Sequence, residues 1–301
     1  MSFRKLIQTI SYKIECKKDI RLKKKILAQK RKDILEYYTK NISDDPEIKE
    51  SLRYLRANPL QTFCSDFTKV YQWNQIRVLT DDAKGLPYVI HEGKRLYFIR
   101  SWKKRTIQYN YCGLLAEQDP DSPHCYLQDG FNIQENDILL DVGSAEGILS
   151  LHHIEKLKRV VLFERDPQWV EALEATFEPW KEKVTIVRKY VSNLNDDENI
   201  TIDRYLADKD YIPSFIKIDV EGAEKQVLEG MAETMNISGL EIATCTYHQK
   251  KDFLALSDLL AQRGFSCQPS KGYMMFLNYP DSLQPPYFRR GLIRAIKTEP
   301  N

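Results

Sequence analysis

An acidic, glycine-containing segment is the first feature of this sequence that suits ligand binding. The run Asp141 to Gly147, DVGSAEG, follows the apolar residues 138–140. Glycines here let the backbone turn and approach a ligand, and the amides of a helix that starts there favour a carboxylate or phosphate. The spacing is G-x-x-x-G and not the G-x-G-x-x-G of a dinucleotide fold, which disfavours a nicotinamide cofactor. Alone, the run is also compatible with a tight turn that binds nothing.

Glu164 is the second feature, because it ends the apolar run 160–163, the next one along the chain. An acidic side chain at this position can accept hydrogen bonds from both ribose hydroxyls of a nucleoside. A single glutamate at a strand end is often only solvated. Its pairing with the glycine loop favours a site for a nucleoside-containing ligand.

Carboxylates at the end of a third apolar run are the candidate catalytic groups. The segment FIKIDVEGAE, residues 215–224, brings Asp219 and Glu221 to the same predicted edge as Asp141. If the strand continues through them, these alternate residues share one face and the two carboxylates can act together. They are candidate catalytic residues, or ligands of a divalent ion that activates a hydroxyl. Glu224 is expected to be a favourable first-turn charge on the following helix.

Histidines supply the candidates for proton transfer. His248 follows a predicted strand at 240–246, and its ordinary pKa suits a general base near neutral pH. Its alternative role is to order the loop between strand and helix. His124 stands in a polar loop that can close over an acceptor, or is a surface histidine. His152 and His153 are adjacent on a predicted helix and are expected to be structural.

The elements that position these residues alternate between strands and helices. Short apolar runs typical of buried parallel strands occupy 138–142, 160–164, 184–188 and 215–219, with further strands expected at 240–246 and 273–277. Helical patterns occupy 145–157, 167–178, 223–235 and 251–263. This alternation predicts an α/β fold with a doubly wound sheet and right-handed crossovers.

The first 135 residues have a different pattern. Apolar residues recur at helical spacing over 3–40, and Pro46 begins a second predicted helix. Runs rich in β-branched and aromatic residues flank Glu92-Gly93 and predict a hairpin, and a short helix is predicted at 109–117. We therefore expect four parts: a basic amphipathic helical arm at 1–60, a small α+β cap at 61–135, a Rossmann-like domain at 136–280 and a basic C-terminal tail at 281–301.

Charge is distributed unevenly along the 301 residues, whose formal net charge is +2. Residues 1–40 carry 13 Lys or Arg and 4 Asp or Glu, a net of +9, and the rest of the chain has a net of −7. The main body lacks the basic face of a nucleic-acid enzyme, so no nucleic-acid partner is expected. The arm and the segment 287–297 are candidates for contact with an anionic membrane, for packing against the cap, or for binding a glycan-lipid phosphate or a partner enzyme.

Composition excludes several other classes. No apolar run approaches the roughly 18 residues that cross a membrane, and the N-terminal sequence lacks a signal-peptide pattern, so a cytoplasmic protein is expected. The six cysteines have no C-x-x-C spacing, which indicates a reducing compartment. The five histidines form no H-x-x-x-H pair, so no dedicated metal site is expected.

Several of these segments together resemble a known family. DVGSAEG, VVLFERD, VTIVRKYVSN, ITIDRYL and FIKIDVEGAEKQVLEGM are similar to the FkbM family of S-adenosylmethionine-dependent methyltransferases over about residues 105–278. IDVEGAE is the most specific of these motifs, and EQDPDSPH and CTYH resemble a bacterial branch of the family. The resemblance implies a class I methyltransferase fold with S-adenosylmethionine as its cofactor.

The resemblance also implies roles for residues at the strand ends. The implied cofactor-binding residues are Asp141, Gly143, Ser144, Gly147, Glu164, Arg165, Tyr190, Ser192 and Asp219. The residues from Asp141 to Gly147 would lie at the methionine end of the cofactor or at the start of the covering helix. Glu164 would contact the ribose, and Arg165, Tyr190 and Ser192 would lie beside the adenosine. Asp219 and Glu221 would lie close to the transferred methyl group.

The resulting expectation is an O-methyltransferase that acts on a hydroxyl of a carbohydrate, such as a surface-polysaccharide or glycolipid precursor. His248 is the candidate base, and His124 is the candidate contact to the acceptor. A polyketide-like natural product is the alternative acceptor. A cofactor-binding but non-catalytic partner subunit in glycan synthesis is the alternative function.

Overall fold

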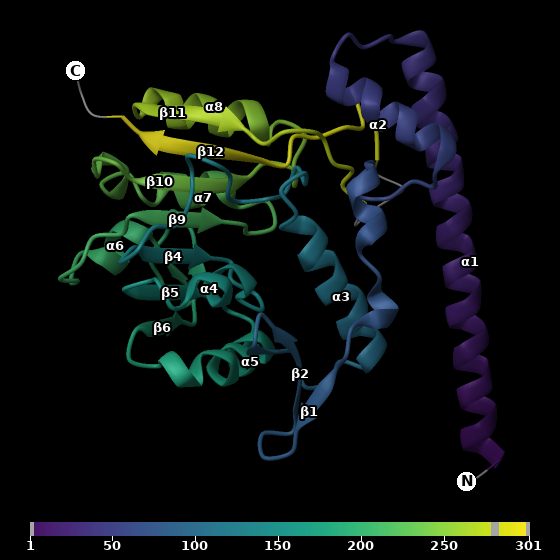
Figure 1. Cartoon of the computed structure of the whole chain (residues 1–301), viewed down its shortest axis with the longest axis horizontal. Coiled ribbons are helices and arrows are strands. Elements are labelled where there is room, and N and C mark those ends of the chain that lie inside the picture. The colour runs from purple at the N-terminus through teal and green to yellow at the C-terminus, as the bar shows by residue number, and fades with distance from the viewer. Residues whose placement is uncertain (1–2, 278–282, 299–301) are drawn as a thin grey trace. The chain divides into compact units, whose positions relative to one another are not determined.

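The computed structural model describes residues 3–277 and 283–298, with side chains from Arg21 onward. It divides into two compact units, each made from two stretches of the chain (Figure 1). Unit 1 comprises the residues up to Asp66 together with Tyr273–Arg289, and unit 2 comprises Phe67–Gly272 together with the residues from Arg290 onward.

Unit 2 is built on a seven-stranded sheet with the strand order β11-β12-β10-β9-β4-β5-β6. The parallel strands are β4 (Ile138–Val142), β5 (Arg159–Phe163), β6 (Val184–Val187), β9 (Phe215–Ile218) and β10 (Glu241–Cys245). β12 (Leu292–Lys297) is antiparallel to β10 and to β11 (Phe265–Pro269). The order reverses between β4 and β9, and their carboxyl ends therefore form the edge at which open α/β sheets bind ligands.

Helices cover both faces of this sheet (Figure 1). Side chains of α3 (Lys104–Glu117), α4 (Ile148–His153) and α5 (Pro167–Phe177) belong to the core on one face, and those of α6 (Ile202–Leu206), α7 (Glu224–Glu229) and α8 (Asp252–Gln262) to the core on the other.

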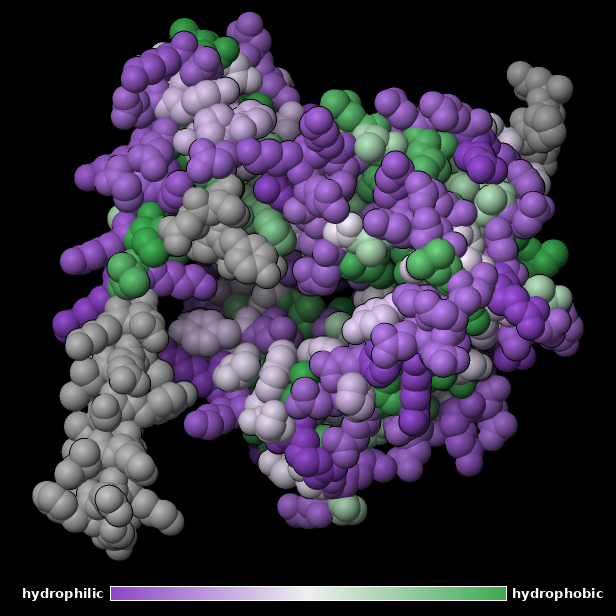
Figure 2. All heavy atoms as spheres, turned by 180° about the vertical axis from the view of Figure 1, so that it is seen from behind, coloured by the Kyte–Doolittle hydropathy of each residue, from purple (hydrophilic) through white to green (hydrophobic). Residues whose placement is uncertain are grey.

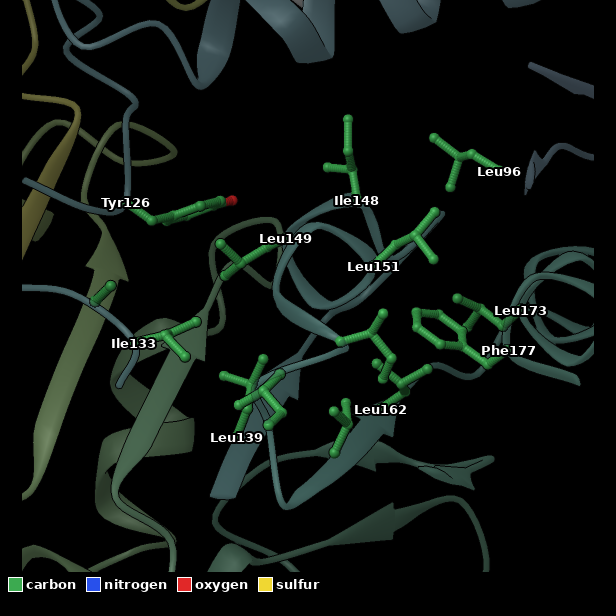
Figure 3. Packing of buried hydrophobic residues seen from close by; sticks show 14 of the residues in the cluster. Leu96, Tyr126, Ile133, Leu139, Ile148, Leu149, Leu151, Leu162, Leu173 and Phe177 are labelled. Atoms are coloured by element: carbon green, nitrogen blue, oxygen red, sulfur yellow. The ribbon is translucent and has the colours of Figure 1, made fainter. Parts of the chain in front are cut away.

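Alternation along the strands builds these two cores. Successive strand residues point to opposite faces, so Leu139 and Leu162 belong to the first core and Leu140 and Val161 to the second. Figure 3 shows side chains from α4 and α5 packed over Leu139 and Leu162 in the first core. Each such buried side chain stabilises the fold by roughly 1.5–3 kcal/mol.

A three-stranded antiparallel sheet belongs to the same unit. It has the order β1 (Leu79–Asp81), β2 (Leu86–His91) and β3 (Lys94–Tyr97), and the predicted hairpin turn is confirmed. Glu92 and Gly93 have φ values of +50° and +80°, as a two-residue hairpin turn requires. Leu96 and Phe98 lie in the first core, so this sheet packs as part of unit 2.

Apart from the two helices of unit 1, the remaining described elements are short. They are the two-stranded pair β7 (Tyr190–Val191) and β8 (Asn199–Ile200), and the 3-10 turns Asp66–Val70, Trp73–Gln75, Glu178–Trp180 and Thr234–Asn236.

Unit 1 contains two helices, α1 (Phe3–Lys40) and α2 (Pro46–Ala57). Asp45 caps α2, since its Oδ1 accepts hydrogen bonds from the amides of Glu47 (2.8 Å) and Ile48 (3.3 Å). The core of the unit joins α1 and α2 to the returning stretch of chain through buried residues that include Ile34, Leu55, Met275 and Phe288.

The structure differs from the sequence-based expectation at the end of the chain. The segment 273–277 is not a strand: within the described residues, Met274 makes only isolated bridges, with Phe63 and Arg289. β12 lies instead in the segment expected to be a basic tail, and its Leu292 and Ile293 are fully buried in the sheet. These apolar residues are therefore not available for contact with a membrane.

A buried charge at the centre of β12 explains why the strand was missed. Arg294 donates hydrogen bonds to the carbonyls of Tyr126 (3.0 Å) and Cys125 (2.5 Å) and to Oε1 of Gln128 (2.6 Å). An arginine within an apolar run indicates a surface segment, unless other parts of the fold supply its acceptors. Here the loop before β4 supplies them.

Hydrophilic residues predominate on the face of the molecule in Figure 2, and hydrophobic residues are scattered among them. The large exposed hydrophobic residues come from separate segments of the chain and include Leu22, Ile42, Ile90, Leu194 and Leu254. In the described part of the chain, no helix is both long and apolar enough to span a membrane.

Candidate active site

A cavity of about 180 Å³ lies at the carboxyl ends of β4 and β9 in unit 2. The side chains with polar or charged groups that border it are Glu117, Gln118, His124, Tyr126, Asp141, Ser144, Glu146, Lys217, Asp219, Glu221 and Tyr247. The cavity therefore lies at the edge of the sheet that the sequence predicts to bind a ligand.

The turn after β4 forms one wall of this cavity. Gly143 has a φ of +74°, and a Cβ at this position would lie only 1.9 Å from the carbonyl oxygen of Asp219. Only glycine therefore allows β4 and the end of β9 to approach this closely. Gly147 has a different role: a Cβ there would meet Leu173 and Phe177 at 2.9 Å, so this glycine allows close packing at the start of α4.

Asp141 is buried at the base of the cavity. Its Oδ2 accepts a hydrogen bond from Ser150 Oγ (2.7 Å), and its Oδ1 lies 3.1 Å from Lys217 Nζ. Lys217 also donates to the carbonyl oxygen of Gly143 (2.5 Å). Burial acts to lower the pKa of Lys217, but the carboxylates of Asp141 and Asp219 outweigh it and raise that pKa. Lys217 therefore stays charged and joins β9 to the turn after β4.

Asp219 lies between two tyrosines. Tyr126 Oη donates to its Oδ2 (2.8 Å), Tyr247 Oη donates to its Oδ1 (3.4 Å), and His124 Nε2 lies 3.6 Å from Oδ2. Burial opposes ionisation of Asp219, but His124 and the charge of Lys217 outweigh burial and lower its pKa well below the usual range. Asp219 is therefore an ionised carboxylate on the cavity wall.

His248 is held by Glu224, which we expected to act only as a favourable charge in the first turn of α7. Its Nδ1 lies 2.8 Å from Oε1 of the buried Glu224, and its Nε2 lies 3.6 Å from both Asp219 Oδ1 and Glu221 Oε2. Burial acts to lower the pKa of His248, but Glu224 and then Asp219 raise it overall. His248 is not among the described residues that border the cavity, and it reaches the cavity through Asp219 and Glu221.

His124 borders the cavity directly and is buried, so the alternative of a surface histidine is wrong. Its Nε2 lies 3.3 Å from Tyr247 Oη, and its buried Nδ1 has no hydrogen-bond partner within the described residues. Burial acts to lower its pKa, but Glu117 and Asp219 raise it overall. His124 therefore lies on the cavity wall with its Nε2 beside Tyr247 and Asp219.

Glu164 shapes the turn that borders the cavity. Its Oε2 accepts a hydrogen bond from the amide of Ala145 (3.0 Å), and its Oε1 accepts one from the amide of Asp166 (2.8 Å). Ala145 has a φ of +44°, which is uncommon for a residue with a side chain. Glu164 therefore stabilises the conformation of the turn, in addition to the ribose contact that the resemblance implies.

The residues expected beside the adenosine lie farther along the same edge. Arg165 pairs with Glu198 (3.4 Å), Tyr190 is 57% exposed on β7, and Ser192 Oγ accepts a hydrogen bond from the amide of Leu194 (3.2 Å). The described boundary of the cavity includes neither these three residues nor Glu164.

The charges around the cavity fit a cationic ligand. Five carboxylates border it, those of Glu117, Asp141, Glu146, Asp219 and Glu221, and Lys217 is the only lysine or arginine among its described lining residues. Burial, followed by the nearby Glu117, raises the pKa of Glu146 to about 8. S-adenosylmethionine carries an ammonium and a sulfonium charge besides its own carboxylate, and its net positive charge would offset part of the negative charge around the cavity.

Several of these residues were not predicted from the sequence. Lys217 and Glu146 lie inside the two motifs, and a lysine at the centre of an apolar strand was the available signal for a buried ion pair. Glu117 and Tyr126 come from the segment before β4. No periodicity or spacing in the sequence connects them to the sheet.

Comparison with known proteins agrees with this site. The model of the methyltransferase FkbM domain matches residues 106–267, which is more than half of the chain. The search of curated proteins gave no match.

Solved structures with some similarity include three methyltransferase-related proteins. The methyltransferase FkbM from Methylobacillus flagellatus is 16% identical, with 89% of this chain and 59% of that chain covered and a TM-score of 0.43. SMU.1697c from Streptococcus mutans, in complex with SAH, is 14% identical, with 55% of this chain and 90% of that chain covered and a TM-score of 0.38. An rRNA methylase from Streptococcus thermophilus is 17% identical, with 56% of this chain and 90% of that chain covered and a TM-score of 0.39. These likenesses are too weak to support a conclusion about this chain.

The family match agrees with the order of the strands, the glycine turn after β4 and the carboxylates of the IDVEGAE motif. The predicted α/β class I methyltransferase fold and its cofactor, S-adenosylmethionine, are confirmed. The chain belongs to the FkbM family of S-adenosylmethionine-dependent methyltransferases.

Proposed function

We propose that this methyltransferase acts on a hydroxyl oxygen of a carbohydrate, in the synthesis of a surface polysaccharide or glycolipid of bacterial type. One arrangement carries the proposal. The ionised Asp219 borders the cavity and lies 3.6 Å from His248, whose other ring nitrogen is bound by the buried Glu224. The arrangement provides a carboxylate that can orient an acceptor hydroxyl and an oriented base that can receive its proton.

The proposed mechanism depends on positioning and on proton removal. S-adenosylmethionine supplies an activated methyl group on a sulfonium sulfur. A sugar hydroxyl is a weak nucleophile, so holding it in line and removing its proton both accelerate transfer. Asp219 accepts the hydrogen bond from the hydroxyl proton and orients the oxygen. As the methyl group is transferred, this proton passes through Asp219 to Nε2 of His248, and Glu224 at Nδ1 holds the ring and stabilises the imidazolium.

A second cavity, of about 550 Å³, offers room for the acceptor. It shares Leu114, Gln118, Ile148 and Leu149 with the smaller cavity. Its other lining residues combine polar side chains, such as Asn132, with apolar ones. The hydroxyls of a sugar can form hydrogen bonds with the polar side chains, and its C–H faces can pack on the apolar ones.

This lining also supports our proposal that the acceptor is not a nucleic acid. No lysine or arginine is among the described residues that border the larger cavity. Nucleic-acid sites need positive side chains that neutralise the phosphates.

Labelled methyl transfer tests the function. The wild-type protein, given methyl-labelled S-adenosylmethionine and a panel of glycans and other hydroxyl compounds, is expected to label a carbohydrate oxygen. His248→Asn is expected to lower kcat at least about 100-fold, because a general base contributes 10²–10⁴-fold. Its affinity for S-adenosylhomocysteine, measured by calorimetry, should stay within about twofold of wild type. Full activity of this variant would eliminate His248 as the base.

Glu224→Gln is the matched variant in the same assay. Glutamine can still accept the hydrogen bond from His248 Nδ1 but has no charge. The pKa of His248 should therefore fall, and the acidic limb of the kcat/KM profile should move to lower pH. An unmoved limb would show that Glu224 does not act through His248. Labelling of a nitrogen or carbon would refute O-methylation. Retained cofactor binding with no turnover on any acceptor would favour the alternative, a non-catalytic partner subunit.

We also propose that the protein is cytoplasmic and makes peripheral contact with a membrane through the basic arm. The net charge of +9 on residues 1–40 supports the membrane contact. Free thiols at the five described cysteines, Cys64, Cys112, Cys125, Cys245 and Cys267, support a reducing compartment.

A further inference from the structure

Three side chains with metal-binding atoms meet at the wall of the larger cavity. His91 ends β2, Glu92 is the first residue of the hairpin turn, and His152 lies on α4. One possible ligand atom from each lies within 4.8 Å of the other two. All three side chains border the 550 Å³ cavity, and none of them borders the smaller cavity at Asp219.

His91 is the most informative member of this group. The residue is only 6% exposed, and its Nδ1 lies 2.9 Å from Tyr111 Oη. Its Nε2 is buried and has no hydrogen-bond partner among the residues that the structure describes. When Nδ1–H donates to Tyr111, Nε2 carries a lone pair and no proton. Metal-binding histidines are oriented in this way, by a hydrogen bond from the ring nitrogen that does not bind the metal.

Glu92 and His152 complete the group from the other side. Glu92 Oε2 lies 2.9 Å from His152 Nδ1, and both side chains are about half exposed. Zinc binds nitrogen and oxygen at about 2.0–2.2 Å in a tetrahedral site, so its ligand atoms lie roughly 3.3 Å apart. Rotation of these two exposed side chains can bring the present separations to that value.

We propose that His91, Glu92 and His152 bind a divalent transition-metal ion of the zinc class. Two imidazoles and one carboxylate are a ligand set of zinc sites that keep an open coordination position. Imidazole ligands favour zinc, nickel or copper over magnesium and calcium. The fourth position is left to water or to an oxygen atom of a molecule in the larger cavity.

This site goes beyond the methyl transfer proposed above and does not depend on it. It departs from the sequence-based expectation of no dedicated metal site. That expectation rested on the spacing of histidines along the chain. The ligands come from two distant segments that the packing of β3 near α4 brings together.

Zinc titration of the untagged full-length protein tests the proposal. After treatment with EDTA and its removal, the protein is titrated with ZnCl2 and, in parallel, with MgCl2, and bound metal is measured by mass spectrometry. One zinc per chain is expected, with no comparable binding of magnesium. His152→Gln and Glu92→Gln should each weaken zinc binding more than tenfold, because losing even an outer-shell partner costs roughly 10–100-fold.

The variants also locate the ion. His152 and Glu92 are partly exposed, so their replacement should leave the thermal unfolding midpoint close to that of wild type. Glu155→Gln, at an exposed acid shortly after α4, should bind zinc as wild type does. Absence of zinc binding to the wild-type protein would overturn the proposal. A second result would also overturn it: His152→Gln and Glu92→Gln both bind zinc with wild-type affinity, and His124→Gln loses zinc affinity. That result would place the ion at Asp219.

Discussion

Glu146 shows how burial and neighbouring charge act on a single carboxyl group. Burial, followed by the nearby Glu117, raises its pKa to about 8, so it is mostly protonated at pH 7. A cationic ligand beside Glu146 favours its ionised form. Binding of such a ligand below pH 8 is therefore expected to release the proton that Glu146 carries, to the extent that the ligand lowers its pKa.

The affinity for S-adenosylmethionine is therefore expected to depend on Glu146 between about pH 6.5 and 9. It should increase with pH, by up to tenfold per unit below pH 8, and level off above it. Calorimetry over this pH range, in buffers of different ionisation enthalpy, measures both the affinity and the protons released.

Glu146→Gln is the control for this prediction. The α-amino group of the ligand itself titrates near pH 8 with either protein, so the difference between wild type and variant is the relevant quantity. The glutamine variant should have the smaller pH dependence. Identical slopes for the two proteins would show that Glu146 does not face the bound cofactor.

At the residue scale, the sequence was most informative where function requires a charge at the end of an apolar strand. Asp141 and Asp219 were predicted on that basis, and both border the cavity. Tyr126 was not predicted, because a tyrosine in a loop has no spacing relation to the sheet. The pairing of His248 with Glu224 was also missed, because the acid has a sufficient local role at the start of α7.

The turn after β4 makes an element-scale prediction. Gly143→Ala would place a methyl group 1.9 Å from the carbonyl oxygen of Asp219, and it would also strain a φ of +74°. It should lower the free energy of unfolding by about 3 kcal/mol or more and abolish cofactor binding. Urea unfolding and calorimetry measure the two effects.

Gly93→Ala is the matched control, because Gly93 also has a positive φ, +80°, but a Cβ there has no neighbour within 4 Å. It should cost only about 1–2 kcal/mol, the strain of a side chain at a positive φ, and leave cofactor binding unchanged. Equal losses in the two variants would show that backbone strain alone matters, and that the close approach of β4 and β9 does not.

Elements were predictable where one local pattern determined them. Apolar runs indicated β4 and β9, and a glycine turn between β-rich runs indicated the β2–β3 hairpin. α4 is shorter than the helix predicted at 145–157, because the first residues of that range belong to the turn after β4. β11 was missed since it is an edge strand with mostly solvent-facing residues, and its partner β12 comes later in the chain.

The uneven distribution of charge is a property of the whole molecule. The excess of positive charge is confined to the first 40 residues, and the rest of the chain is acidic. Each basic residue near an anionic membrane surface contributes roughly 1 kcal/mol, and salt screens this attraction. The protein is expected to co-sediment with vesicles containing 30% phosphatidylglycerol at low salt, but not at 0.5 M NaCl.

Exposed lysines on the described part of α1 allow a direct test of this membrane contact. Replacing Lys23, Lys24 and Lys25 together by alanine should reduce vesicle binding at least tenfold. The control replaces three exposed lysines outside the arm, Lys158, Lys181 and Lys271, which removes the same charge. Equal losses in the two triple variants would show a nonspecific effect of net charge, and binding to neutral phosphatidylcholine vesicles would argue against an electrostatic contact.

The position of β12 has a consequence for how this chain folds. β12 lies between β10 and β11 although it follows both in the sequence, and the stretch 273–289 of unit 1 intervenes. β11 therefore has no strand partner until β12 is in place, and contacts between such distant segments form slowly. A chain that has not yet placed β12 presents the open edge of β10, a template for pairing with other chains. We expect the insertion of β12 to be the step at which productive folding and aggregation compete.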